Sequence, residues 1–111
     1  MTKLIKERDI AAYLRKRVTE IGGIYRKVSW EGRSDAPDYL IMANHAHFFV
    51  ETKAPREKPR PSQEREFATM YRYGGIWVSV VSDFDDVDDL IHGIQGQDLC
   101  RRLPPENTNQ S

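Results

Sequence analysis

The stretch DYLIMANHAHFFVETK, Asp38–Lys53, predicts two strands joined by a tight turn. Residues 38–42 form the first strand, 43–46 the turn and 47–53 the returning strand. Strand side chains alternate, so Glu51 and Lys53 lie on the same face of their strand. The antiparallel return brings Asp38, at the start of the first strand, close to both. We therefore expect two carboxylates and one ammonium group to meet at one end of a sheet.

The segments on either side of this hairpin predict a mixed α/β domain with a central sheet and flanking helices. Four apolar residues at helical spacing mark the first helix: Ile10, Leu14, Val18 and Ile21. Ser62 is the expected N-cap of the second helix, and the nearly continuous apolar run 76–82 predicts a strand buried on both faces. The expected order is α-β-β-β-α-β-α: helix 3–21, strands 24–29, 38–42 and 47–53, helix 62–73, strand 76–82 and helix 85–93.

The length and composition fit one small domain. The chain has 111 residues, for which we expect a single domain over 1–96 and a partly flexible C-terminal tail over 97–111. No apolar run is long enough to span a membrane, and the N-terminus lacks the apolar core of a secretory signal. The single cysteine, Cys100, fits a reducing compartment. We expect a cytoplasmic protein.

The charge is neutral overall but unevenly distributed. The chain has 17 basic and 17 acidic residues, yet residues 1–82 carry a net charge of +5 and residues 83–111 one of −5. Basic side chains that flank the hairpin end are candidates for binding the phosphates of DNA, although ordinary solvated charge is the alternative. The candidates are Lys27, Arg33, Arg56, Lys58 and Arg60.

The predicted cluster at the hairpin end has a clear chemical use. Hard divalent cations bind carboxylate and carbonyl oxygens, so Asp38, Glu51 and the backbone carbonyl of Thr52 are candidate ligands. A bound metal polarises a phosphate and lowers the pKa of a bound water, and Lys53 can orient that water or stabilise the developing charge. The alternative is a cross-strand Lys–Glu pair on a solvated face.

The order of these motifs resembles the PD-(D/E)XK nuclease superfamily, and more narrowly the stand-alone VRR-NUC proteins of phage and bacteria. The resemblance covers residues 5–95 and implies a restriction-endonuclease-like fold. It rests on Glu7, Gly22-Gly23, Lys27, the segment from Gly32 to Pro37-Asp38, FVETKAP at 49–55, Ser62-Gln63, and Gly74-Gly75 before the last strand.

The resemblance also implies a role for each matching residue. Asp38 and Glu51 match the metal ligands, Lys53 the catalytic lysine, and Gln63 the glutamine of the helix after the catalytic strand. Glu7 matches an acidic residue that supports the metal site directly or through water. Read without the family, Gln63 could be a helix cap and Glu7 a peripheral residue. One departure is that Asp35 and Ala36 stand where the family usually has glycine and valine.

These observations together predict a metal-dependent DNA endonuclease that uses Mg²⁺ or Mn²⁺. Because stand-alone members of the family are similar to Holliday-junction resolvases, we expect a homodimer that cuts branched or junction DNA. One alternative is a repair nuclease that acts on flaps or ends. Another is a DNA-binding module that keeps the fold without catalysis.

Overall fold

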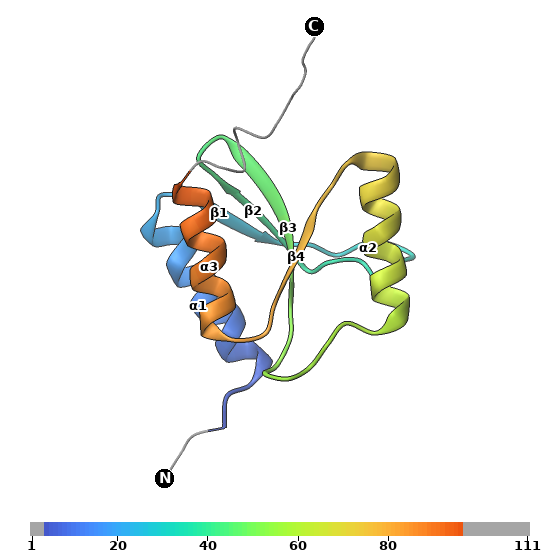
Figure 1. Cartoon of the computed structure of the whole chain (residues 1–111), viewed down its shortest axis with the longest axis horizontal. Helices are drawn as coiled ribbons and strands as arrows, with labels where there is room; N and C mark the ends of the chain where they lie inside the picture. Colours follow the sequence, from blue (N-terminus) through green and yellow to red (C-terminus); the bar gives the residue numbers. More distant parts are fainter. Residues whose placement is uncertain (1–3, 97–111) are drawn as a thin grey trace, which may run out of the picture.

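The computed structural model describes residues 4–96, which form three helices and a four-stranded sheet (Figure 1). The predicted tail over 97–111 lies outside the described residues. The observed order is the predicted α-β-β-β-α-β-α. The elements are α1 (Glu7–Glu20), β1 (Ile24–Lys27), β2 (Tyr39–Ala43), β3 (Ala46–Thr52), α2 (Pro61–Gly74), β4 (Val78–Val81) and α3 (Phe84–Gln95).

The sheet is mixed and has the strand order β1-β2-β3-β4. Strands β1, β2 and β3 pair antiparallel, whereas β4 pairs parallel to β3. The β2–β3 hairpin turns at Asn44 and His45, whose φ angles are 56° and 64°. Two-residue hairpin turns that match the twist of the strands require a positive φ at both positions. Tyr39 is paired with Val50, so this register brings Asp38 and Glu51 to the same end of the sheet.

The hydrophobic core lies between α1, α3 and one face of the sheet. The predicted stripe of α1 is confirmed, since Ile10, Leu14 and Val18 are fully buried. Helices α1 and α3 lie side by side on that face, and α2 stands on the other side of the sheet (Figure 1). Among the residues of α2, only Gln63 is buried. The fully buried core therefore lies on the α1–α3 side of the sheet, whereas the one buried residue of α2 is the polar Gln63.

The predicted starts of α1 and α2 were wrong. Residues 4–6 are not helical, because Lys6 is extended and its N–H donates to the Asp9 carboxylate at 2.9 Å, which fixes α1 to begin at Glu7. Helix α2 begins at Pro61 with Arg60 as its N-cap, since proline fits the first helical position. The Ser62 hydroxyl instead donates to Asp35.

The expected strand over 76–82 was wrong in its burial and its length. Strand β4 covers only Val78–Val81 and forms an edge of the sheet. Only Val81 of this strand is buried, and the preceding Trp77 is 70% exposed. The apolar run reflects a partly buried edge strand and an exposed aromatic residue beside it. Within residues 4–96, no helix is long and apolar enough to cross a membrane.

Candidate functional site

Thr52 joins two of the predicted site carboxylates at the end of β3. Its hydroxyl lies 2.9 Å from Asp38 Oδ2 and 3.2 Å from Glu7 Oε2, and its backbone N–H donates to Asp38 Oδ1 at 3.2 Å. A hydroxyl has a single proton to donate, so the two carboxylates share one donor. Glu7, at the first residue of α1, therefore lies beside Asp38 through Thr52, and its predicted support of a metal site stays a prediction.

Glu51 lies beside this group on the other face of the sheet end and is 6% exposed. Its Oε2 accepts a hydrogen bond from Gln63 Nε2 at 2.9 Å and lies 3.4 Å from Lys53 Nζ. Burial raises the pKa of the Glu51 carboxyl, and the nearby charge of Asp38 raises it further, while Gln63 and Lys53 oppose the rise. Glu51 and Lys53 thus meet at this end of the sheet, with Asp38 near enough to affect the Glu51 carboxyl.

Glu51 Oε1 has no hydrogen-bond partner although it is buried. A buried carboxylate oxygen without a partner is costly, and together with the unfavourable interaction with Asp38 it makes the site attractive to a cation. No group of three or more His, Cys, Asp or Glu side chains within residues 4–96 is arranged to hold a metal. Mg²⁺, however, commonly uses one or two carboxylates and keeps several waters, so the donor set fits such an ion.

Gln63 has two functions in the local structure. Its Nε2 donates to Glu51, while its Oε1 accepts from the backbone N–H of Arg60 at 3.0 Å. The capping alternative for this residue is thus confirmed, and the bond to Glu51 is compatible with the predicted role at the site, which stays a prediction. This pair of bonds connects the start of α2 to β3.

Two of the five predicted phosphate-binding residues are engaged by carboxylates. Arg33 pairs with Glu66 on α2, and Arg60 pairs with Asp35 at 3.2 Å. Hydrogen bonds from Ser62 and then Arg60 lower the pKa of the Asp35 carboxyl. These contacts fasten the loop before Asp38 to the first turns of α2. Asp35, noted as a departure from the family pattern, is therefore a loop anchor.

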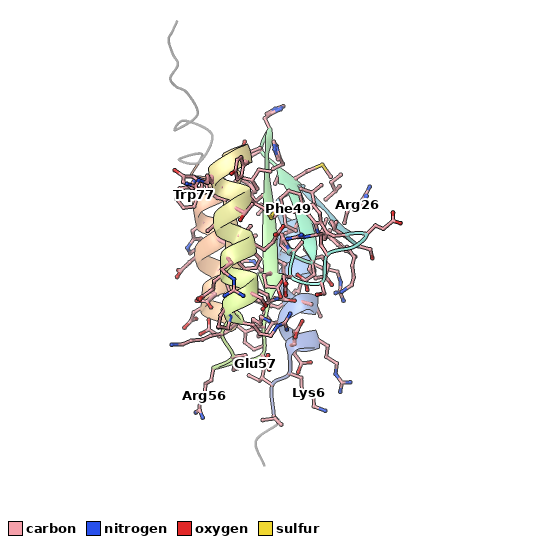
Figure 2. All side chains as sticks on the ribbon, turned by 90° about the vertical axis from the view of Figure 1, so that its right-hand side faces the viewer. Lys6, Arg26, Phe49, Arg56, Glu57 and Trp77 are labelled. Atoms are coloured by element: carbon pink, nitrogen blue, oxygen red, sulfur yellow. The ribbon has the colours of Figure 1, made fainter. Side chains whose placement is uncertain are left out.

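The other three predicted basic residues lie on the surface. Lys27, at the end of β1, has its Nζ 5.1 Å from the centre of the Tyr39 ring. Arg56 and Lys58 are exposed in the segment between β3 and α2, and Figure 2 shows Arg56 projecting away from the ribbon. The basic residues thus border the cluster without being part of it.

Two features of the site were not predicted from the sequence, namely the contacts of the Thr52 side chain and the Asp35 anchor. The backbone carbonyl of Thr52 as a metal ligand stays a prediction, whereas its side-chain hydroxyl contacts two carboxylates. A buried threonine between Glu51 and Lys53 was the available signal. Its partner Glu7 lies 45 residues away, so only the fold brings the pair together.

Comparison with known proteins identifies the family. The chain is 38% identical over 93 residues to a protein named "Putative nuclease p44" from Acyrthosiphon pisum secondary endosymbiont phage 1, a match covering 83% of this chain and 98% of that one. A solved structure named "VRR_NUC domain" is 41% identical, with a TM-score of 0.69, and the match covers 79% of this chain and 96% of the other. No family model matches the chain. The shared length, identity and fold show that the chain belongs to the VRR-NUC family of nucleases.

Proposed function

We propose that this nuclease is a divalent-metal-dependent DNA endonuclease whose site comprises Glu7, Asp38, Glu51, Lys53 and Gln63. The observation that carries the proposal is the buried Glu51 carboxylate, whose Oε1 has no hydrogen-bond partner while its Oε2 lies 3.4 Å from Lys53 Nζ. Burial, and then the charge of Asp38, raise the pKa of this carboxyl. A cluster of carboxylates next to a lysine suits a site that holds a cation and a phosphate together.

The residues have distinct roles in this proposal. Asp38 and Glu51 hold Mg²⁺ or Mn²⁺, with Glu7 supporting directly or through water and the Thr52 carbonyl as a further ligand. When bound, the ion supplies a Lewis acid for the phosphate and lowers the pKa of water. Gln63 orients Glu51 and the Thr52 hydroxyl orients Asp38. The Lys53 ammonium stabilises the negative charge that develops on the phosphate.

We further propose that two copies act together on branched DNA. Three aromatic side chains at the C-terminal end of α2 and just beyond it are exposed: Tyr71 by 50%, Tyr73 by 82% and Trp77 by 70%. At roughly 200 Å² for a whole aromatic side chain, they present about 400 Å² of surface, half of the roughly 800 Å² per partner in a typical stable complex. Trp77 lies at the opposite end of α2 from Arg56 (Figure 2), so pairing there leaves the site open.

The dimer has its own test. Sedimentation should give twice the mass of one chain, and replacing both Tyr71 and Trp77 by alanine should give monomers. Replacing the exposed Leu4 and Phe84, on the α1–α3 side, should leave the mass unchanged. A parent protein that stays monomeric at micromolar concentration contradicts the dimer.

Cleavage assays test the activity. The substrates are four-way junction, flap, single-stranded and linear duplex DNA with Mg²⁺, and the variants are Asp38→Ala and Lys53→Ala. The matched controls replace exposed residues of the same type, Asp89→Ala and Lys16→Ala. We expect junction cleavage by the parent and the controls and a loss of at least a hundredfold in both site variants.

Other results would favour the other candidates. Cleavage confined to flaps or ends indicates a repair nuclease. DNA binding without cleavage of any substrate indicates a non-catalytic module. Equal cleavage by the parent and Lys53→Ala would refute the assigned site. The phage source of the related protein makes the cytoplasm of an infected bacterium the expected place of action.

A further inference from the structure

The chain turns sharply directly after the catalytic strand, over residues 54–57. The Glu57 N–H donates to the Ala54 carbonyl at 2.9 Å, and the Glu57 carboxylate accepts from the Ala54 N–H at 3.0 Å. Pro55 occupies the second position, and Arg56, in the third, has a φ of 72°. A proline followed by a residue of positive φ identifies a type II turn.

Arg56 occupies a position that favours glycine. A side chain in the left-handed region is disfavoured, and the third residue of a type II turn is usually glycine or asparagine for this reason. Strain of this kind persists where the surrounding structure enforces it, and it often marks a functional site. The two hydrogen bonds made by Glu57 enforce it here.

The guanidinium of Arg56 is also free to bind a ligand. It is exposed, and within residues 4–96 it makes no ion pair or hydrogen bond. Arg33 and Arg60, by contrast, are held by Glu66 and Asp35, so a phosphate would have to displace a carboxylate to reach them. Of the three arginines predicted to bind DNA, Arg56 is the one that can bind a phosphate without first losing a carboxylate partner.

We propose that the Ala54–Glu57 turn is a phosphate-binding turn, in which the Arg56 guanidinium binds a backbone phosphate of the DNA strand beside the site. Glu57 is its positioning residue, since it closes the turn that directs Arg56 outward (Figure 2). This inference rests on the proposed function, because it requires DNA as the ligand. The inference gives a reason for an arginine at a position where glycine would remove the backbone strain.

Arg56→Gly tests the inference, with His45→Gly as its matched control. His45 is also exposed and has a φ of 64°, but it lies in the hairpin turn at the far end of β2 and β3. Both variants relieve a left-handed residue, so neither should lower the melting temperature. Only Arg56→Gly should weaken binding to junction DNA, by about tenfold, and reduce the slope of log Kd against log salt by about 0.9.

Glu57 variants separate positioning from a merely structural contribution. Glu57→Gln keeps an acceptor oxygen for the Ala54 N–H and should retain the Kd and salt slope of the parent. Glu57→Ala removes the acceptor for the Ala54 N–H. Its Kd and its salt slope should therefore approach those of Arg56→Gly. A melting temperature of Arg56→Gly several degrees below that of the parent would contradict the proposal that Arg56 strains the backbone.

The failure of this inference can be told from the failure of the proposed function. If the parent binds DNA and Arg56→Gly binds it with an unchanged Kd and salt slope, the phosphate-binding turn is refuted while the nuclease proposal stands. If the parent neither binds nor cleaves any DNA, the proposed function is refuted, and the turn with it.

Discussion

Replacing Thr52 by valine removes the donor shared by two site carboxylates while keeping the side-chain shape. Thr52 is 1% exposed, and its hydroxyl lies 2.9 Å from Asp38 Oδ2 and 3.2 Å from Glu7 Oε2. One hydroxyl proton makes one such bond at a time, and a bond to a charged group contributes about 1.5–3 kcal/mol. We therefore expect Thr52→Val to lower the free energy of unfolding by about 2 kcal/mol.

Thermal and urea denaturation measure this loss. A change of 1 kcal/mol shifts the melting temperature of a domain of this size by about 4–8 °C, so a fall on the order of 10 °C is expected. Thr19→Val is the control, because the Thr19 hydroxyl is exposed and donates only within its own helix. Its effect should stay within about 0.5 kcal/mol.

A double-mutant cycle with Asp38→Asn identifies the partner. If the hydroxyl acts through this carboxylate, the two substitutions should be non-additive by about 1 kcal/mol or more. The cleavage rate of Thr52→Val should also fall at least tenfold, since Asp38 and Glu7 lose their common donor. Additive effects, or a melting temperature equal to that of the parent, would refute the reasoning.

Three further predictions concern the packing, the site and the loop anchor. Gly23→Ala should lower stability by about 1–3 kcal/mol, because its Cβ would lie 2.8 Å from that of Ala43, whereas Gly93→Ala in α3 meets nothing within 4 Å and should be neutral or stabilising in urea denaturation. Gln63→Ala should cost about 1.5–3 kcal/mol and reduce cleavage, because Glu51 loses its donor; unchanged stability and rate would contradict this. The pKa of Asp35 is lowered in the folded chain, so its contribution is present above its unfolded pKa of about 3.9 and is lost as pH falls through the folded value. Acid titration of stability should therefore be shallower in Asp35→Asn than in the parent, and identical curves would count against the anchor.

Local patterns were sufficient to predict most elements and the convergence of Asp38, Glu51 and Lys53. Alternation along two strands and a short turn determine which side chains meet at a hairpin end, so this part of the site needed no long-range information. The position of Glu7 came from the family pattern, and the structure accounts for it through the Thr52 hydroxyl.

The features that were missed depend on contacts between distant segments. The run 76–82 has the composition of a central strand, yet only the pairing of the whole sheet makes β4 an edge. The start of α2 is an exception, because Pro61 and the bond from the Arg60 N–H to Gln63, three residues later, determine it locally. The anchor between Asp35 and Arg60 joins residues 25 positions apart, and nothing in the local sequence pairs them.

The central claim is that Glu51 belongs to a metal-dependent cleavage site, and the most direct measurement is the rate of junction cleavage as Mg²⁺ is titrated. Glu51→Gln keeps the shape and the bond from Gln63 but removes the charge, and Glu31→Gln is a control at an exposed residue of the same type. We expect cleavage that requires Mg²⁺ in the parent and in Glu31→Gln and that is abolished in Glu51→Gln at every Mg²⁺ concentration. Cleavage of equal rate in Glu51→Gln, or cleavage by the parent without a divalent ion, would contradict it.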